Sequence, residues 1–319
     1  MSRITSHYSF PSLLRRASLG LLLLGVFAWT GCDSGGSGMD DSGSTLDQVR
    51  YDLEAQSNDG ALPEGVGGTV TFWNAGSDQT IVTLELDGGA TYANVSHPAH
   101  IHKNTASEGG DIAIYLTPVD GSGGGGTSAR LVDRPIDELA DFDGYVNVHE
   151  SVENLGNVVS QGNIGANAEG TTGEGLDLVD DPRAVTYDLS ANTNDGSIPD
   201  GISGQVRFQE LTSDRTIVTV SLDPGSEDGS TGANVSHPAH IHENTASEGG
   251  DIVEYLSPVD GSDTAAKSSK LVDRSYDSLV SFDGYVNVHE SVENLGNVVS
   301  QGNIGANADD TDDGGDPSY

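Results

Sequence analysis

The sequence predicts an all-β fold made of two tandem antiparallel β-sandwich domains, and three observations lead to this prediction. Apolar and polar residues alternate with a period of two in many short runs, as in strands with one buried face. Clusters of Gly, Asn, Asp and Pro separate these runs at the spacing expected of a sandwich or barrel. The 319-residue chain also contains two copies of one unit, and about 120 residues per copy are enough for a core.

Each copy is expected to form about six to eight short strands, and the alternation indicates which residues point inward. Residues 135–142 are the exception, because Ile136, Leu139 and Phe142 recur at a helical spacing. The alternating apolar runs of the first copy are Val70 and Phe72, then Val82, Leu84 and Leu86, then Ile112, Ile114 and Leu116, and finally Val146 and Val148, of which the two valines are expected to point into the core.

The two repeats, 47–168 and 183–308, are expected to be separate domains. The stretch 142–168 is identical to 282–308 over 27 residues. We expect a flexible acidic Gly/Ser tether at 32–46, a linker at 169–182 and an acidic disordered tail at 309–319, because these segments have little to bury.

Residues 1–31 have the features of an export signal. Arginines precede the apolar stretch Leu19–Trp29, which is too short for a membrane span. Cys32, the single cysteine, follows Thr30-Gly31 and resembles the lipidated cysteine of a bacterial lipoprotein. We therefore expect an exported lipoprotein, anchored through Cys32 and facing the periplasm or the cell surface. The alternative is a cleaved signal that leaves Cys32 as a free thiol.

The charge of the chain limits its partners. Fifty acidic and 13 basic residues give a formal net charge of −37. This balance excludes nucleic acid as a partner, because phosphate binding needs basic patches. An acidic, lysine-poor surface is typical of a halophilic protein, whose self-repulsion is screened by concentrated salt. Calcium binding would also explain the acidity, but no spaced calcium-hand loop is present.

Eight of the nine histidines form two copies of one pattern, and these are the candidate metal ligands. On an extended strand His100 and His102 share one face, and His149 approaches them if its strand is a neighbour. All-nitrogen sites suit zinc or copper. The ligands would be His97, His100, His102 and His149, with His237, His240, His242 and His289. Asp111, Asn147 and Glu150, with Asp251, Asn287 and Glu290, are the candidate acceptors that would fix the histidine tautomers.

Two interpretations of these histidines stay open. They either bind a metal or bridge polar backbone groups at strand ends without one. The sequence has no Gly-x-Ser-x-Gly elbow and no other catalytic set, so we expect no enzyme activity.

The segments His97–His102 (HPAHIH) and Tyr145–His149 (YVNVH) resemble the CHRD domain, a module first defined in chordin and found in bacterial exported proteins. The resemblance covers both repeats and implies an immunoglobulin-like or superoxide-dismutase-like sandwich. It implies no activity. The closing segment departs from the family, because Asn157 and Val159 replace its Glu and Arg. Any ion pair those residues make in the family is therefore absent here.

The expected function is that of a non-enzymatic lipoprotein with two tandem CHRD-like modules that bind an unknown protein or surface ligand. Duplication of a weak site would raise avidity. The alternatives are a copper- or zinc-binding protein, a superoxide-dismutase-like metalloenzyme, and a structural spacer. Four histidines per repeat are few for a two-metal dismutase site, and one cysteine cannot supply that family's disulfide.

Overall fold

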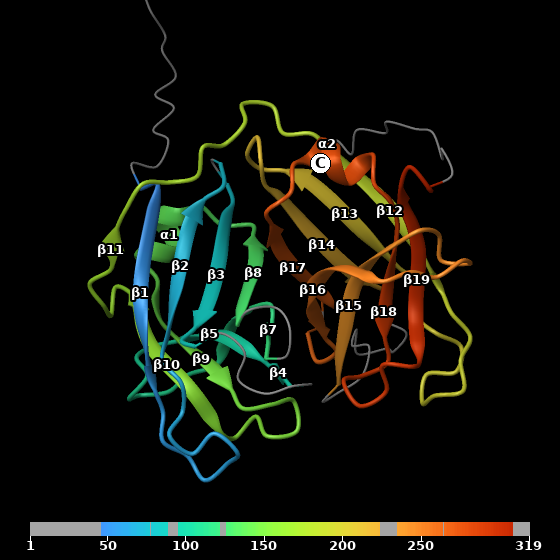
Figure 1. Cartoon of the computed structure of the whole chain (residues 1–319). Coiled ribbons are helices and arrows are strands. Elements are labelled where there is room, and N and C mark those ends of the chain that lie inside the picture. Colours follow the sequence, from blue (N-terminus) through green and yellow to red (C-terminus); the bar gives the residue numbers. More distant parts are fainter. Residues whose placement is uncertain are drawn as a thin grey trace, which may run out of the picture. The chain divides into compact units, whose positions relative to one another are not determined.

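The computed structural model of the chain describes residues 46–76, 78–88, 95–121, 126–223, 235–263 and 265–308. These residues form β-strands and two short helices (Figure 1), so the predicted all-β class is confirmed. The expected export signal, Cys32, nearly all of the tether and the acidic tail lie outside the described residues. Within the described part of the chain, no helix has the length and apolar character needed to span a membrane.

The strands of the two repeats follow the same order. In the first repeat they are β1 (Gln48–Ala55), β2 (Gly68–Asn74), β3 (Thr80–Leu86), β4 (Ser96–His97), β5 (Ala99–Lys103), β6 (Ile112–Tyr115), β7 (Val119–Asp120), β8 (Thr127–Val132), β9 (Asp143–His149) and β10 (Val158–Gly165). β11 (Thr171–Thr172) follows in the linker. In the second repeat they are β12 (Ala184–Ala191), β13 (Gly204–Glu210), β14 (Thr216–Leu222), β15 (Ser236–Glu243), β16 (Ile252–Asp260), β17 (Lys267–Val272), β18 (Asp283–His289) and β19 (Val298–Gly305).

Each repeat consists of two antiparallel layers that share their first strand. In the first repeat β1 pairs with β2 through Gln48–Leu53 and with β10 through Glu54 and Ala55. One layer continues from β2 to β3 and β8, and the other from β10 to β9, β5 and β6. The inward residues of both layers, such as Phe72 and Val146, form one core. This arrangement is the predicted sandwich.

Short helices close one end of each core. The helical spacing at 135–142 corresponds to α1 (Ile136–Ala140), which buries Ile136 and Leu139. Its counterpart is α2 (Tyr276–Val280). The Ser275 side chain caps the start of this helix by accepting a hydrogen bond from the Ser278 N–H.

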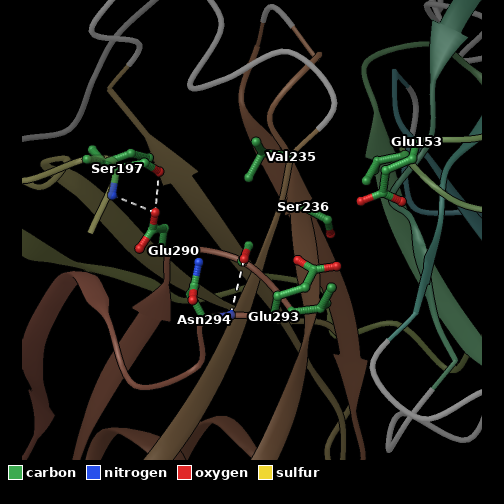
Figure 2. A pocket seen from close by; sticks show the side chains of 11 residues that line it. Glu153, Ser197, Val235, Ser236, Glu290, Glu293 and Asn294 are labelled. Atoms are coloured by element: carbon green, nitrogen blue, oxygen red, sulfur yellow. Dashed lines mark hydrogen bonds between the residues drawn. The ribbon is translucent and has the colours of Figure 1, made fainter. Parts of the chain in front are cut away.

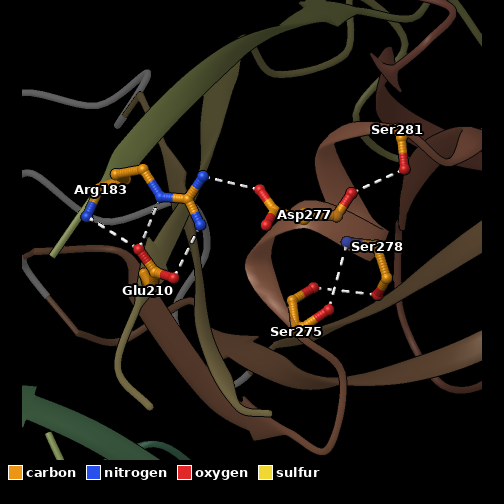
Figure 3. Close-up of polar contacts among 6 residues, drawn as sticks. All are labelled: Arg183, Glu210, Ser275, Asp277, Ser278 and Ser281. Carbon is orange, nitrogen blue, oxygen red and sulfur yellow. Dashed lines mark hydrogen bonds and ion pairs between the residues drawn. The ribbon is translucent and has the colours of Figure 1, made fainter. Parts of the chain in front are cut away.

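An ion network ties α2 to the start of the second repeat (Figure 3). Arg183 donates two hydrogen bonds of 2.8 Å to Glu210 and one of 2.7 Å to Asp277. Its guanidinium also lies 4.7 Å from the centre of the Tyr276 ring. These contacts connect β12, β13 and α2 at one corner of the repeat.

The two repeats are continuous with each other. β8 pairs with β17 at Ala129 and Ser269, which joins strands of both repeats into one 17-stranded sheet. Ile81 and Ile217 belong to one apolar cluster, against which Leu176 and Leu178 of the linker pack. The linker therefore contributes to packing, and the independence of the two domains stays a prediction.

Candidate metal centre

The candidate ligands lie on two adjacent strands, β5 and β9. Ile101 and Val148 are fully buried in the core, so their neighbours project from the opposite face of the layer. His100 is paired with Asn147 across the two strands. His149, two residues farther along β9, is therefore a diagonal neighbour of His100, within reach of a long side chain.

Three imidazoles of each repeat converge. The groups are His100, His102 and His149, and His240, His242 and His289; in each, one nitrogen per ring lies within 4.8 Å of the others. His100 Nδ1 is 3.2 Å from His149 Nε2, and the equivalent distance in the second repeat is 3.1 Å. The same geometry thus occurs twice, and each triad can hold a metal ion.

Two backbone carbonyls determine the tautomers of the outer rings. His102 Nδ1 lies 3.0 Å from the Gly110 carbonyl oxygen, and His149 Nδ1 lies 2.6 Å from that of Leu155. A carbonyl only accepts, so a neutral ring must donate from Nδ1 and keep its lone pair on Nε2. Histidine metal ligands commonly have this kind of anchor.

The tautomer of His100 follows from that of His149. Because His149 Nε2 carries a lone pair, His100 Nδ1 must donate to it, which places the His100 lone pair on Nε2. Among the described residues, the buried Nε2 atoms of His100 and His102 have no hydrogen-bond partner. The triad of the first repeat therefore combines converging rings with two buried lone pairs that have no partner among the described residues.

The turn after β5 depends on particular residues for its conformation. Asn104 has a positive φ of 68°, and its side chain donates to the Gly109 carbonyl. A Cβ atom on Gly110 would lie 2.1 Å from the Lys103 carbonyl oxygen, so only glycine fits there. The turn presents the Gly110 carbonyl to His102.

Burial favours the neutral form of His100 and His149. The pKa of His100 is lowered to about 3, first by burial and then by repulsion from His149 and His102. Burial also lowers the pKa of His149. Neutral imidazole is the form that binds metals, so protons do not compete with a metal at these two rings near pH 7.

Two tyrosines flank the triad. The Tyr115 ring contacts His100 edge-on at 4.9 Å between centres, and the Tyr145 ring stacks on His102 at 5.0 Å. These contacts restrict the rotation of both imidazoles. The equivalent contacts occur at Tyr255 and Tyr285.

His97 and His237 lie outside the triads. His97 is fully buried, and its Nδ1 is 3.0 Å from the His149 carbonyl oxygen. His237 has the equivalent contact with His289 at 3.1 Å. Three of the four predicted ligands in each repeat therefore come together, and the fourth contacts the backbone of a triad residue.

Three of the six predicted acceptors, Glu150, Asn147 and Glu290, accept hydrogen bonds from groups outside the triads. Glu150 accepts from the Ala61 N–H and the Asn157 side chain, both at 2.7 Å, and Asn147 accepts from the Gln161 side chain. The Asp111 side chain is exposed. In the second repeat Glu290 accepts from Ser197 and Asn297, Asp251 is exposed, and the buried Asn287 Oδ1 has no partner among the described residues. Sequence reasoning missed the backbone acceptors, Gly110 and Leu155.

A cavity of about 300 Å³ lies beside Glu290 (Figure 2). Ser197 donates to Glu290 on one side of it, and Ser236 and Glu293 line another part. The residues described as lining this cavity include none of the triad histidines.

Comparisons of the chain with protein-family models, with curated proteins and with solved structures found no match.

Proposed function

We propose that the chain is an exported, non-enzymatic binding protein whose two histidine triads each hold one zinc or copper ion. The observation that carries this proposal is the buried, unpartnered Nε2 atom of His102 and of its counterpart His242, each within a converging triad. A buried acceptor without a partner costs about 1–3 kcal/mol, and a bound cation would remove that cost. Imidazole nitrogens suit both metals.

The spacing of the nitrogens supports a single ion. Two ligand nitrogens at about 2.0–2.1 Å from a tetrahedral zinc ion are roughly 3.3 Å apart. His100 Nδ1 and His149 Nε2 are 3.2 Å apart, so a small adjustment brings both to one ion. Ligation through His100 Nδ1 would move the proton that this atom donates to His149 onto His100 Nε2, so the ring would stay neutral.

The competing interpretation assigns the histidines a purely structural role. His97 fits that role, because its ring bonds the backbone of His149. The triad does not, because backbone bridging uses only one nitrogen of His102 and leaves the other buried and unpaired. A metal accounts for both nitrogens.

The cellular setting follows from the sequence features. The signal-like segment and Cys32 support export and a lipid anchor facing the periplasm or the cell surface. The HPAHIH and YVNVH segments support membership of the CHRD family. Two equivalent sites on one tethered chain would hold two ions close to the membrane.

Metal content tests this proposal. The untagged full chain, stripped with a chelator and dialysed against zinc or copper, is expected to retain two ions. A variant with His102→Ala and His242→Ala is expected to lose them, whereas Lys103→Ala, an exposed neighbour, is expected to keep both. A folded wild-type chain that retains no ion would contradict the proposal and leave the histidines structural.

A further inference from the structure

We propose that each bound ion takes, as its remaining ligand, a small organic monoanion whose apolar body rests on a rim formed by Ile112, Tyr115 and Leu155, and by Ile252, Tyr255 and Leu295. An aromatic or aliphatic carboxylate has this chemistry. The inference rests on the proposed metal site and adds the class of ligand that the site receives.

The exposed apolar side chains of the described chain are concentrated around the triads. Ile112, Leu155, Ile252, Tyr255 and Leu295 are the large hydrophobic residues exposed in the described part, at 36–41%. Ile112 and Leu155 correspond to Ile252 and Leu295, so both repeats keep the same exposed positions. Single exposed apolar residues are ordinary, but a group around one polar site marks a binding surface.

Each rim residue is tied to one histidine of the triad. Ile112 is paired with His102 across β5 and β6, and side chains of paired residues project from the same face. Tyr115 contacts the His100 ring, and Leu155 provides the carbonyl that His149 bonds. Ile112 and Tyr115 therefore lie beside two of the converging rings, and the Leu155 backbone contacts the third.

In the first repeat, the least buried ring of the triad is the one beside Ile112. His100 and His149 are 4% and 7% exposed, whereas His102, which is paired with Ile112, is half-buried. An external ligand would therefore reach the ion beside His102 and meet the rim as it enters.

The charge of the bound ion and the charge of the chain together favour a small anionic ligand. Three neutral imidazoles leave a divalent ion with its full charge, so an anionic donor is favoured at the remaining position. The chain carries a formal charge of −37, which repels a second copy and other acidic macromolecules. A small monoanion meets far less of this repulsion, and its apolar body gains by covering the rim.

The test compares acetate with benzoate on the cobalt-loaded full chain, because visible absorption of cobalt(II) reports changes in its ligands. Benzoate is expected to bind about tenfold more tightly, the effect of burying roughly 55 Å² of apolar surface. Ile112→Ser with Ile252→Ser should reduce this preference to about twofold or less while cobalt content and acetate affinity stay unchanged. Glu85→Gln, an exposed change on β3, should keep the preference.

The outcomes separate the two proposals. Equal affinities for acetate and benzoate, or an unchanged preference in the Ile→Ser variant, would overturn this inference and leave the metal site standing. Cobalt-dependent dimerisation in sedimentation, abolished by the same variant, would assign the rim to a second copy and also overturn it. Failure to take up cobalt would remove the metal site and this inference together.

Discussion

Acidification of the metal-free chain from pH 8 to pH 5 is expected to reduce its free energy of unfolding, chiefly through His100 and His240. In the unfolded chain a histidine takes up a proton below its ordinary pKa of 6.5, whereas burial lowers the pKa of folded His100 to about 3. Between these two values the unfolded state binds more protons, so stability is full above pH 6.5 and falls as the pH falls.

The magnitude follows from the width of this window. At pH 5 the unfolded histidine is about 1.5 pH units below its pKa, and at about 1.4 kcal/mol per unit His100 loses about 2 kcal/mol. His240, whose pKa is also lowered to about 3, doubles the loss to about 4 kcal/mol if both repeats unfold together. Burial lowers the pKa of His97 and His149 as well, which acts in the same direction.

Urea unfolding at pH 8 and pH 5 measures this loss, with a chelator and about 1 M salt present so that self-repulsion of the acidic chain is screened. In the variant with His100→Gln and His240→Gln, the difference between the two pH values should shrink, whatever the variant's absolute stability. Equal or greater stability at pH 5 than at pH 8, or an undiminished difference in the variant, would refute the reasoning.

Three substitutions test the parts of the structure that support the triad. Gly110→Ala places a Cβ atom 2.1 Å from the Lys103 carbonyl oxygen and should weaken zinc binding about 10–100-fold in titration calorimetry. Gly156→Ala, whose added Cβ atom would meet nothing within 4 Å, should leave zinc affinity unchanged. Equal zinc affinities of the two variants would contradict the role of the Gly110 carbonyl as an anchor of His102. Ile101→Val, on the core side of the same strand, should cost about 1 kcal/mol in urea unfolding and leave metal content unchanged; a lost ion would show that core and site are not separable. Glu150→Ala removes the acceptor of two hydrogen bonds and should cost about 2 kcal/mol by the same assay, and no loss of stability would mean that the loop at Ala61 is held by other contacts.

Strand alternation predicts the triad because β5 and β9 are regular at the residues concerned. Ile101, Val146 and Val148 point into the core as the period of two requires, so His100 and His102 share the other face. Strand alternation no longer predicts the side-chain direction at His97. Pro98 separates His97 from β5, and His97 belongs to the two-residue strand β4. Its ring consequently bonds the backbone of His149.

Other features have no side-chain signature in the sequence. The carbonyls of Gly110 and Leu155 belong to turns, and any residue type carries a carbonyl, so the anchors of His102 and His149 were not predictable from residue identity. The contact between the two repeats was not predictable from the sequence for a different reason. Ile81 lies on the face that the alternation assigns to solvent, yet it is fully buried in the apolar cluster shared with the linker and the second repeat.

X-ray absorption at the zinc edge of the zinc-loaded chain tests the central claim most directly, because it identifies the atoms around the ion. We expect two ions per chain, each with three imidazole nitrogens at about 2.0–2.1 Å and one further light ligand. A first shell of oxygen alone, without the scattering pattern of imidazole rings, would place the zinc on the acidic surface and contradict the assignment of His100, His102 and His149 as ligands.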